Sequence, residues 1–227
     1  MTARQIPFDL RSTPALGRED FFVGECNELA LHWVEIWPQG WQPFPALILH
    51  GPRGSGKSHL ADVWRTRAVA LKWNASDVMA ATTDTILGLK QNVVVDRIDL
   101  LIGDVPSEEK LFHLYNHCRQ NGLYLLGLSW IAPEAMQFSI NDLGSRLRAA
   151  PHAAIFPPDD AVLFKVLARR FHDQGYVVMD GALQFALTRM ERSWEALDHL
   201  IEEAIRKATA EKKQITIPLL RDLMMES

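Results

Sequence analysis

The segment GPRGSGKS, residues 51–58, constrains the fold of this 227-residue chain more than any other feature. It fits the pattern G-x-x-x-x-G-K-[ST] and lies between the short apolar run ALILH (46–50) and a stretch with helical periodicity (56–69). Glycines in such a loop let backbone N–H groups turn towards phosphate oxygens, and the N-terminus of the following helix adds a partial positive charge. The sequence therefore predicts a binding site for the phosphates of a nucleotide.

The residues of this loop have separate expected roles. We expect Lys57 to reach the β- and γ-phosphates, and the hydroxyl of Ser58 to help hold Mg²⁺. The predicted ligand is ADP or ATP with Mg²⁺, and the sequence leaves open which nucleotide is the active one. The loop residues predicted to contact it are Gly51, Pro52, Arg53, Gly54, Ser55, Gly56, Lys57, Ser58 and His59.

A carboxylate on a neighbouring strand is the second expected part of the site. The run VVVDRID places Asp96 after three valines, where it would hold Mg²⁺ through water, although it could also merely cap a strand. Many P-loop ATPases have another acid directly after this one, which polarises the attacking water. Here that position is Arg97, with Asp99 two residues further on, and an arginine cannot serve as a general base. Intrinsic ATP hydrolysis is therefore expected to be weak or absent.

Short apolar runs alternate with helical segments between residues 46 and 157. Because each run looks buried and helices separate the runs, the pattern predicts an α/β fold with a five-stranded parallel sheet covered on both faces. From Pro158 onwards the periodicity is helical only. We therefore expect an α/β nucleotide-binding domain over residues 13–157 and an all-α domain over 158–227. The predicted strands cover residues 46–50, 70–75, 92–96, 123–129 and 153–157.

Charge and cysteine content limit the classes of function. Lys and Arg total 24 against 28 Asp and Glu, and the net charge of −4 argues against DNA binding through a broad basic face. The two cysteines, Cys26 and Cys118, lack metal-ligand spacing, which favours a reducing compartment. No apolar run approaches the ~20 residues of a membrane span, so we expect a cytoplasmic protein.

The N-terminal stretch QIPFDL, residues 5–10, has no partner in the predicted core. Its apolar residues Ile6, Phe8 and Leu10 alternate with a proline and an aspartate. Two explanations stay open. The stretch could be an edge strand, paired with its own domain or with another copy of the chain, since a proline is tolerated at an edge. Alternatively, another protein buries these side chains.

Two further stretches resemble the branch of the AAA+ ATPases that contains the bacterial initiator DnaA. FFVGECN (21–27) resembles the segment that begins the DnaA ATPase domain near the adenine, and NDLGSRLRAA (141–150) resembles the arginine-finger segment of that family. The resemblance extends over about residues 5–224 and implies a P-loop AAA+ domain followed by a C-terminal helical lid. It stops where DnaA would continue into a helix-turn-helix domain, so sequence-specific DNA binding is not expected.

Together with the N-terminal peptide, these features look like the Hda family, which drives regulatory inactivation of DnaA together with the replicative sliding clamp. The peptide of that family has the pattern Gln-apolar-x-apolar-x-Leu, and the residues that match it here are Gln5, Ile6, Phe8 and Leu10. The resemblance implies that residues 1–12 bind the sliding clamp, that DnaA is the second partner, and that the function is negative regulation of replication initiation. A homodimer is also conceivable.

The same resemblance makes Arg146, within the Ser-Arg-Leu part of residues 141–150, the arginine finger. It would act in trans on ATP bound to DnaA and stabilise the charge that develops on the γ-phosphoryl group. Two alternatives stay open: Arg146 could be an ordinary surface arginine of a helix, or the neighbouring Arg148 could take the role.

Two positions depart from the pattern of the family. The strand end that usually senses the γ-phosphate offers Ser129, with Trp130 where the DnaA pattern has Asp. An ungapped alignment places Glu191 at the position of the lid arginine that contacts phosphate. A one-residue slip gives Arg192, which we prefer to Arg189.

Two other classes of function remain open. A P-loop small-molecule kinase is disfavoured by the helical C-terminal part and by the Ser-Arg-Leu segment. A DnaA-like initiator accessory or helicase loader that contacts DNA is weakened by the negative net charge.

Overall fold

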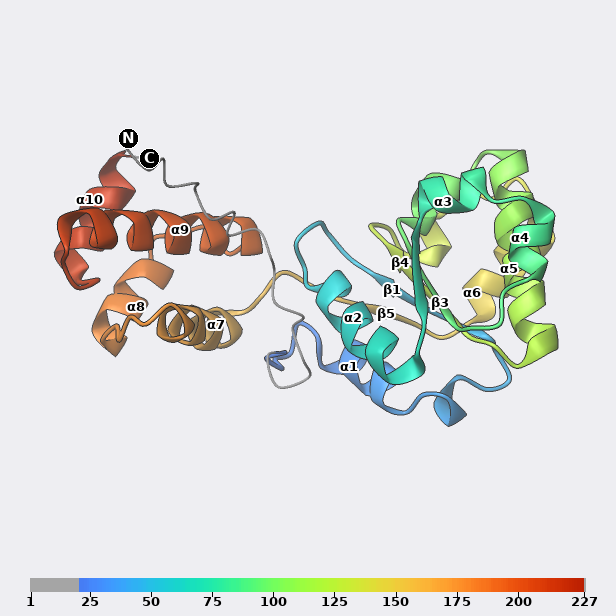
Figure 1. The fold of residues 1–227 in the computed structure, drawn as a ribbon, viewed down its shortest axis with the longest axis horizontal. Coiled ribbons are helices and arrows are strands. Elements are labelled where there is room, and N and C mark those ends of the chain that lie inside the picture. The colour runs from blue at the N-terminus through green and yellow to red at the C-terminus, as the bar shows by residue number, and fades with distance from the viewer. Residues whose placement is uncertain (1–20, 227) are drawn as a thin grey trace, which may run out of the picture.

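The predicted α/β fold with a five-stranded parallel sheet is confirmed by the computed structural model, which describes residues 21–226 (Figure 1). Every strand pair is parallel, and the strand order is β2-β3-β4-β1-β5. The predicted clamp-binding residues Gln5 to Leu10 lie outside the described residues. The strands are β1 (Ala46–His50), β2 (Leu71–Asn74), β3 (Val93–Asp96), β4 (Leu125–Ser129) and β5 (His152–Ala154).

The last strand, β5, is shorter than the predicted strand over residues 153–157. Beyond Ala154 the backbone N–H of Ile155 still donates to the carbonyl oxygen of His50 at 2.7 Å, but that of Phe156 donates to Cys26 at 2.9 Å. Two prolines follow, and because proline has no N–H the ladder cannot continue. The chain therefore leaves the sheet here and runs towards the C-terminal helices.

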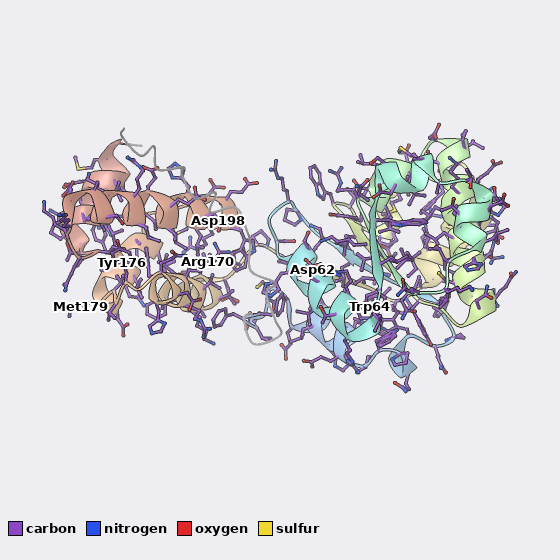
Figure 2. The ribbon with its side chains drawn as sticks, in the orientation of Figure 1. Asp62, Trp64, Arg170, Tyr176, Met179 and Asp198 are labelled. Atoms are coloured by element: carbon purple, nitrogen blue, oxygen red, sulfur yellow. The ribbon has the colours of Figure 1, made fainter. Side chains whose placement is uncertain are left out.

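One face of the sheet is covered by α1 (Glu28–Glu35) and α2 (Lys57–Ala68). Beneath these helices the indoles of Trp41 and Trp64 stack with ring centres 5.3 Å apart, and Trp37 and Tyr124 meet them edge to face. Figure 2 shows Trp64 inside this part of the molecule. The cluster fixes α2, whose first residue follows the phosphate loop, against the sheet.

The other face carries α3 (Ala75–Ala80), α4 (Thr83–Leu87), α5 (Val105–Asn121) and α6 (Asn141–Ala149). Helix α5 ends at Gly122, which adopts a left-handed conformation with φ of 65°. The periodicity did not predict α3 and α4. Side-chain caps from Asn74 and Thr82 begin these short helices, each accepting a hydrogen bond from a backbone N–H of the first turn.

Four helices form the C-terminal part: α7 (Asp160–Asp173), α8 (Asp180–Leu187), α9 (Trp194–Glu211) and α10 (Ile217–Glu226). They pack around their own apolar core, in which Phe171, Leu197 and Leu220 are buried, and Cys26 from the α/β part packs against it. Figure 1 shows these helices beside the α/β part, joined to it by the segment after β5. Within residues 21–226 we find no helix with the length and apolarity needed to cross a membrane.

Candidate nucleotide site

The phosphate loop joins the end of β1 to the start of α2, as the sequence predicts. Gly51, Gly54 and Gly56 all have positive φ angles, of 148°, 72° and 100°, which side chains rarely permit. At Gly51 the space is also closed, since a Cβ there would lie 2.1 Å from the carbonyl oxygen of Ile155. The loop backbone is therefore fixed by the glycine positions and by the chain that follows β5.

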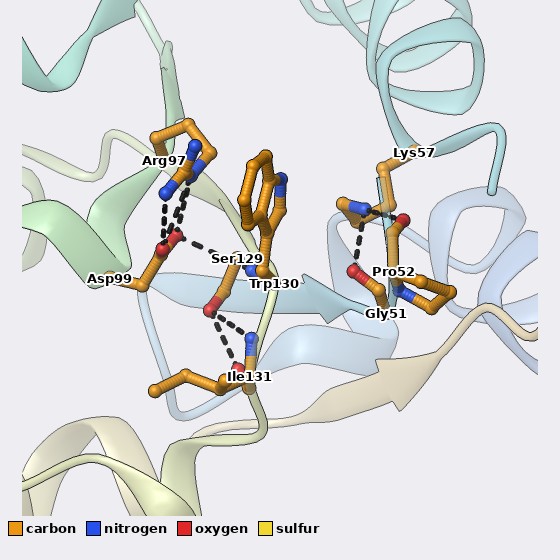
Figure 3. A network of polar contacts seen from close by, with 8 residues as sticks. All are labelled: Gly51, Pro52, Lys57, Arg97, Asp99, Ser129, Trp130 and Ile131. Atoms are coloured by element: carbon orange, nitrogen blue, oxygen red, sulfur yellow. Dashed lines mark hydrogen bonds and ion pairs between the residues drawn. The ribbon is translucent and has the colours of Figure 1, made fainter. Parts of the chain in front are cut away.

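Lys57 is buried at the centre of the loop. Its Nζ donates to the carbonyl oxygens of Gly51 at 2.8 Å and Pro52 at 2.7 Å (Figure 3). The same atom lies 3.3 Å from Oγ of Ser55. Burial lowers the pKa of Lys57 below its usual range, while the carboxylates of Asp96 and Asp99 act in the opposite direction. The ammonium group is thus held by neutral carbonyl groups, which phosphate oxygens would replace as stronger partners.

A cleft of about 460 Å³ lies between the phosphate loop and the C-terminal helices. It brings together most of the predicted nucleotide ligands, and the predicted residues that line it are Arg53, Gly54, Ser55, Gly56, Lys57, Ser58, His59 and Asp96. Gly51 and Pro52 contribute through their carbonyl groups, which hold Lys57. A nucleotide-sized space therefore opens where the motif predicts one.

The N-terminal segment 21–27 supplies one apolar wall of this cleft, through Phe21 and Phe22. The ring of Phe21 meets the imidazole of His59 edge to face, with ring centres 5.2 Å apart. Asn27 holds the segment in place, because it accepts a hydrogen bond from the N–H of Gly24 and donates one to the carbonyl oxygen of Phe22. Aromatic rings at one wall and cations at another suit a base joined to phosphates.

Ser58 and Asp96 both line the cleft, so the two residues predicted to hold Mg²⁺ are on the same surface. A hydroxyl and a carboxylate are the oxygen ligands that Mg²⁺ accepts, together with water and phosphate. Within the part of the chain that the structure describes, no three His, Cys, Asp or Glu side chains are grouped so as to hold a metal ion. These residues therefore fit a magnesium ion that arrives with the nucleotide.

Arg97, directly after β3, adopts a left-handed conformation with φ of 60°. Its guanidinium forms a double hydrogen bond with Asp99, at 3.1 Å from Nε and 2.9 Å from Nη2 to Oδ2. Its Cζ also lies 3.5 Å from the ring centre of Trp130, which follows β4 (Figure 3). Asp99 accepts a further hydrogen bond from the backbone N–H of Trp130 at 3.3 Å, so both carboxylate oxygens are engaged.

Ser129 is fully buried and faces its own loop. Its Oγ donates to the carbonyl oxygen of Ile131 at 2.6 Å and accepts from the N–H of Ile131 at 3.1 Å. Trp130, and not Ser129, is the residue at this strand end that lines the cleft. Sensing of the γ-phosphate by Ser129 stays a prediction, and it would require this hydroxyl to exchange partners.

The residues of the C-terminal helices that line the cleft include Arg169, Arg170, Asp173, Trp194 and Asp198. None of them belongs to a sequence motif, so the sequence alone could not assign them to the site. In Figure 2 Arg170 of α7 and Asp198 of α9 lie opposite each other, and they form an ion pair. Arg169 pairs with Asp173 at 2.9 Å.

The lid arginines considered from the sequence lie elsewhere. Arg192 pairs with Asp160 at 2.7 Å on the exposed surface, and Arg189 donates to the carbonyl oxygen of Phe185. Neither residue lines the cleft. Their role as phosphate contact remains a prediction.

Arg146 lies on α6, against α5, and does not line the cleft of its own chain. Its Nη1 donates to Oδ1 of Asn116 at 2.6 Å and its Nη2 to Asp142 at 2.9 Å, while its side chain is 28% exposed. The alternative residue, Arg148, donates to the carbonyl oxygen of Met136 and lies over the ring of Phe138. An effect of Arg146 on a nucleotide would therefore have to be on one bound by another molecule.

No protein-family model matches the chain. Its sequence is 24% identical, over 230 residues, to an uncharacterized protein of Haemophilus influenzae, with 97% of this chain and 98% of that protein covered. It is 22% identical, over 236 residues, to the chromosomal replication initiator protein DnaA of Bacteroides thetaiotaomicron, with 95% of this chain and 50% of that protein covered. The chain thus spans about half the length of this DnaA relative.

Among solved structures, domain III of DnaA from Thermotoga maritima has a TM-score of 0.82 at 17% identity, with 94% of this chain and 96% of that chain covered. AMPPCP-bound DnaA from Aquifex aeolicus has a TM-score of 0.70 at 18% identity, with 83% of this chain and 64% of that chain covered. Fold and phosphate loop together define a P-loop module with the AAA+ fold. The sequence match to DnaA extends over nearly the whole chain, so the chain is similar to the AAA+ module of DnaA in sequence as well as in fold.

Proposed function

We propose that this protein is a negative regulator of replication initiation, of the Hda type. It binds ADP or ATP in its own cleft, with Mg²⁺, and attaches to the sliding clamp through QIPFDL. From there it presents Arg146 to ATP bound by DnaA and promotes hydrolysis of that ATP. The ADP-bound initiator that results does not start a further round.

The observation that carries this proposal is that the cleft holds phosphate-binding groups but, among the described residues, has no unpaired carboxylate to activate water apart from Asp96, which is assigned to Mg²⁺. Arg97 stands directly after Asp96, and both oxygens of Asp99 are engaged by Arg97 and by the backbone of Trp130. Besides Asp96, the acids that line the described cleft are Asp173 and Asp198, which are paired with Arg169 and Arg170 of α7. A module built in this way suits a regulator better than an ATPase.

The position of Arg146 supports an action in trans. Its guanidinium is partly exposed at the end of α6 and lies outside its own cleft. An arginine supplied by a neighbouring subunit stabilises charge on the transferred phosphoryl group and contributes ~10³–10⁵ in rate in other systems. A DnaA-like module is the expected neighbour, because similar modules associate side by side.

The N-terminal peptide would raise the local concentration of the protein near DnaA by holding it on the clamp. Pro7 restricts the backbone of the peptide, which lowers the entropy lost on binding, and Phe8 and Leu10 are suitable anchors for an apolar pocket. Gln5 can both donate and accept hydrogen bonds at the rim.

The clamp interaction is tested by titrating the purified chain with the sliding clamp. We expect binding in the micromolar range or tighter, at least about tenfold weaker for the double substitution Gln5→Ala/Leu10→Ala. Asp9→Ala is the matched control, since it changes the peptide between the anchors and should leave the affinity within about threefold. If the wild-type chain did not bind, the clamp-dependent part of the proposal would be wrong, and the peptide would be better explained as a self-pairing edge strand.

A further inference from the structure

Arg97 and Trp130 form one unit at the wall of the cleft, although they come from the ends of different strands. The indole covers the guanidinium at 3.5 Å, and Asp99 binds the guanidinium of Arg97 as well as the backbone N–H of Trp130, which holds the Arg97 side chain against the start of the Trp130 loop. Both residues line the cleft together with Asp96 and Lys57. Figure 3 shows Arg97, Asp99 and Trp130 in one close-up view with Lys57.

We propose that Arg97 is a phosphate-binding residue of the site, acting in cis, and that it supplies positive charge which Mg²⁺ would otherwise supply. The nucleotide then binds with only weak dependence on Mg²⁺. This inference rests on the nucleotide binding proposed above and concerns the same cleft.

The guanidinium of Arg97 keeps one terminal nitrogen available for a phosphate oxygen. Its Nε and Nη2 face Asp99, whereas Nη1 makes no hydrogen bond with any residue in the described range 21–226. The side chain is 26% exposed, so it is partly desolvated but still accessible from the cleft. A planar guanidinium fixed by a carboxylate and an indole is preorganised, and a bond from it to a phosphate oxygen is charge-assisted.

The charges around the cleft support the same role for Arg97. All four arginines that line it in the described range have an acidic partner: Arg53 pairs with Glu195, Arg169 with Asp173, Arg170 with Asp198 and Arg97 with Asp99. Arg97 is the least exposed of them, at 26% against 77%, 53% and 41% for Arg53, Arg169 and Arg170, so its charge is the least screened by water. Many P-loop ATPases have an acid directly after the aspartate on the metal side, and this chain has Arg97 there. The exchange of an acid for an arginine makes the local charge more positive by two units. That change favours a polyphosphate and disfavours a divalent cation. Arg97 also helps to lower the pKa of Lys57, which is consistent with two cations acting on one space.

The test is the affinity for ADP and for ATP, measured by calorimetry in excess Mg²⁺ and again in EDTA. For the wild-type chain we expect the two affinities to agree within about tenfold. Arg97→Ala should weaken binding in EDTA by about ten- to a hundredfold and have a smaller effect in Mg²⁺. Arg97→Lys, which keeps the charge without the double bond to Asp99, should lie between. Arg119→Ala, at the exposed end of α5, removes a positive charge outside the cleft and should behave as wild type.

Thermal unfolding without nucleotide shows whether each variant is folded. If Arg97→Ala does not fold, the affinity of Arg97→Lys decides the test. Two results would overturn the inference while leaving the nucleotide site intact: a loss of more than about a hundredfold in wild-type affinity on adding EDTA, or Arg97 variants that bind like wild type in EDTA. A wild-type chain that bound no nucleotide even with Mg²⁺ would instead remove the proposed site itself, and the inference with it.

Discussion

The guanidinium of Arg146 donates a hydrogen bond of 2.6 Å to Oδ1 of Asn116, which joins α6 to α5. Its second terminal nitrogen bonds to Asp142, and its Cζ lies 4.9 Å from the ring centre of Phe112. The proposed finger is therefore held at a defined place on the surface. A side chain fixed in this way loses less entropy when it meets a partner than a freely rotating arginine would.

Asn116→Ala should lower the stimulated hydrolysis of DnaA-bound ATP by about three- to tenfold, because the loss of one neutral hydrogen bond leaves Arg146 less well positioned. The rate is measured with clamp present, and binding to the clamp should not change. Asn121→Ala is the control, since Asn121 lies on the same helix and bonds to His117 rather than to Arg146. Equal rates for the two variants would argue against the positioning role.

Glu108 is completely buried and accepts three backbone hydrogen bonds, from Gly103 at 2.7 Å, Ser139 at 2.9 Å and Ile140 at 2.6 Å. It thereby ties the start of α5 to the segment that leads into α6. Glu108→Ala leaves these N–H groups without a partner and should lower the free energy of unfolding by about 2–4 kcal/mol. Glu108→Gln keeps one acceptor oxygen and should cost less. Urea unfolding measures both, and a loss below about 1 kcal/mol for the alanine variant would contradict this assignment.

Gly51 and Gly54 both have positive φ but differ in the space around them. A Cβ at Gly51 would meet a backbone oxygen at 2.1 Å, whereas at Gly54 the nearest atom lies at 3.6 Å. Gly51→Ala should therefore destabilise the chain by about 2–4 kcal/mol, and Gly54→Ala by about 1–2 kcal/mol through backbone strain alone. Thermal unfolding of both variants without nucleotide shows which one is less stable. If Gly54→Ala were the less stable variant, backbone strain would outweigh the steric contact at Gly51.

The pKa of His50 lies below the usual value of about 6.5, chiefly because burial disfavours the charged imidazole and secondly because His152 lies beside it. The folded chain therefore binds fewer protons here than the unfolded chain. Stability from this group is fully present above about pH 6.5 and is lost as the pH falls towards the folded pKa. His50→Gln should make unfolding less pH-dependent between about pH 5 and pH 6.5. If its stability ran parallel to that of the wild type over this range, His50 would not contribute.

Periodicity and the loop motif were sufficient to predict the sheet, the C-terminal helices and the phosphate loop, because these depend on local patterns. The end of β5 was misjudged because apolar residues continue after the strand has left the sheet. The contact of Arg97 with Trp130 could not be predicted, since it depends on how β3 and β4 end beside each other. Arg169 and Arg170 reach the cleft only through the packing of α7 against the rest of the chain.

The central claim is tested most directly by measuring the conversion of DnaA-bound ATP to ADP, with the sliding clamp loaded on DNA. The wild-type chain should accelerate this conversion, and Arg146→Ala should reduce the acceleration by at least about a hundredfold without affecting clamp binding. Arg148→Ala, two residues away on the same helix, should stay within about threefold of the wild type. An Arg146→Ala variant that accelerated hydrolysis as well as the wild type would contradict the claim.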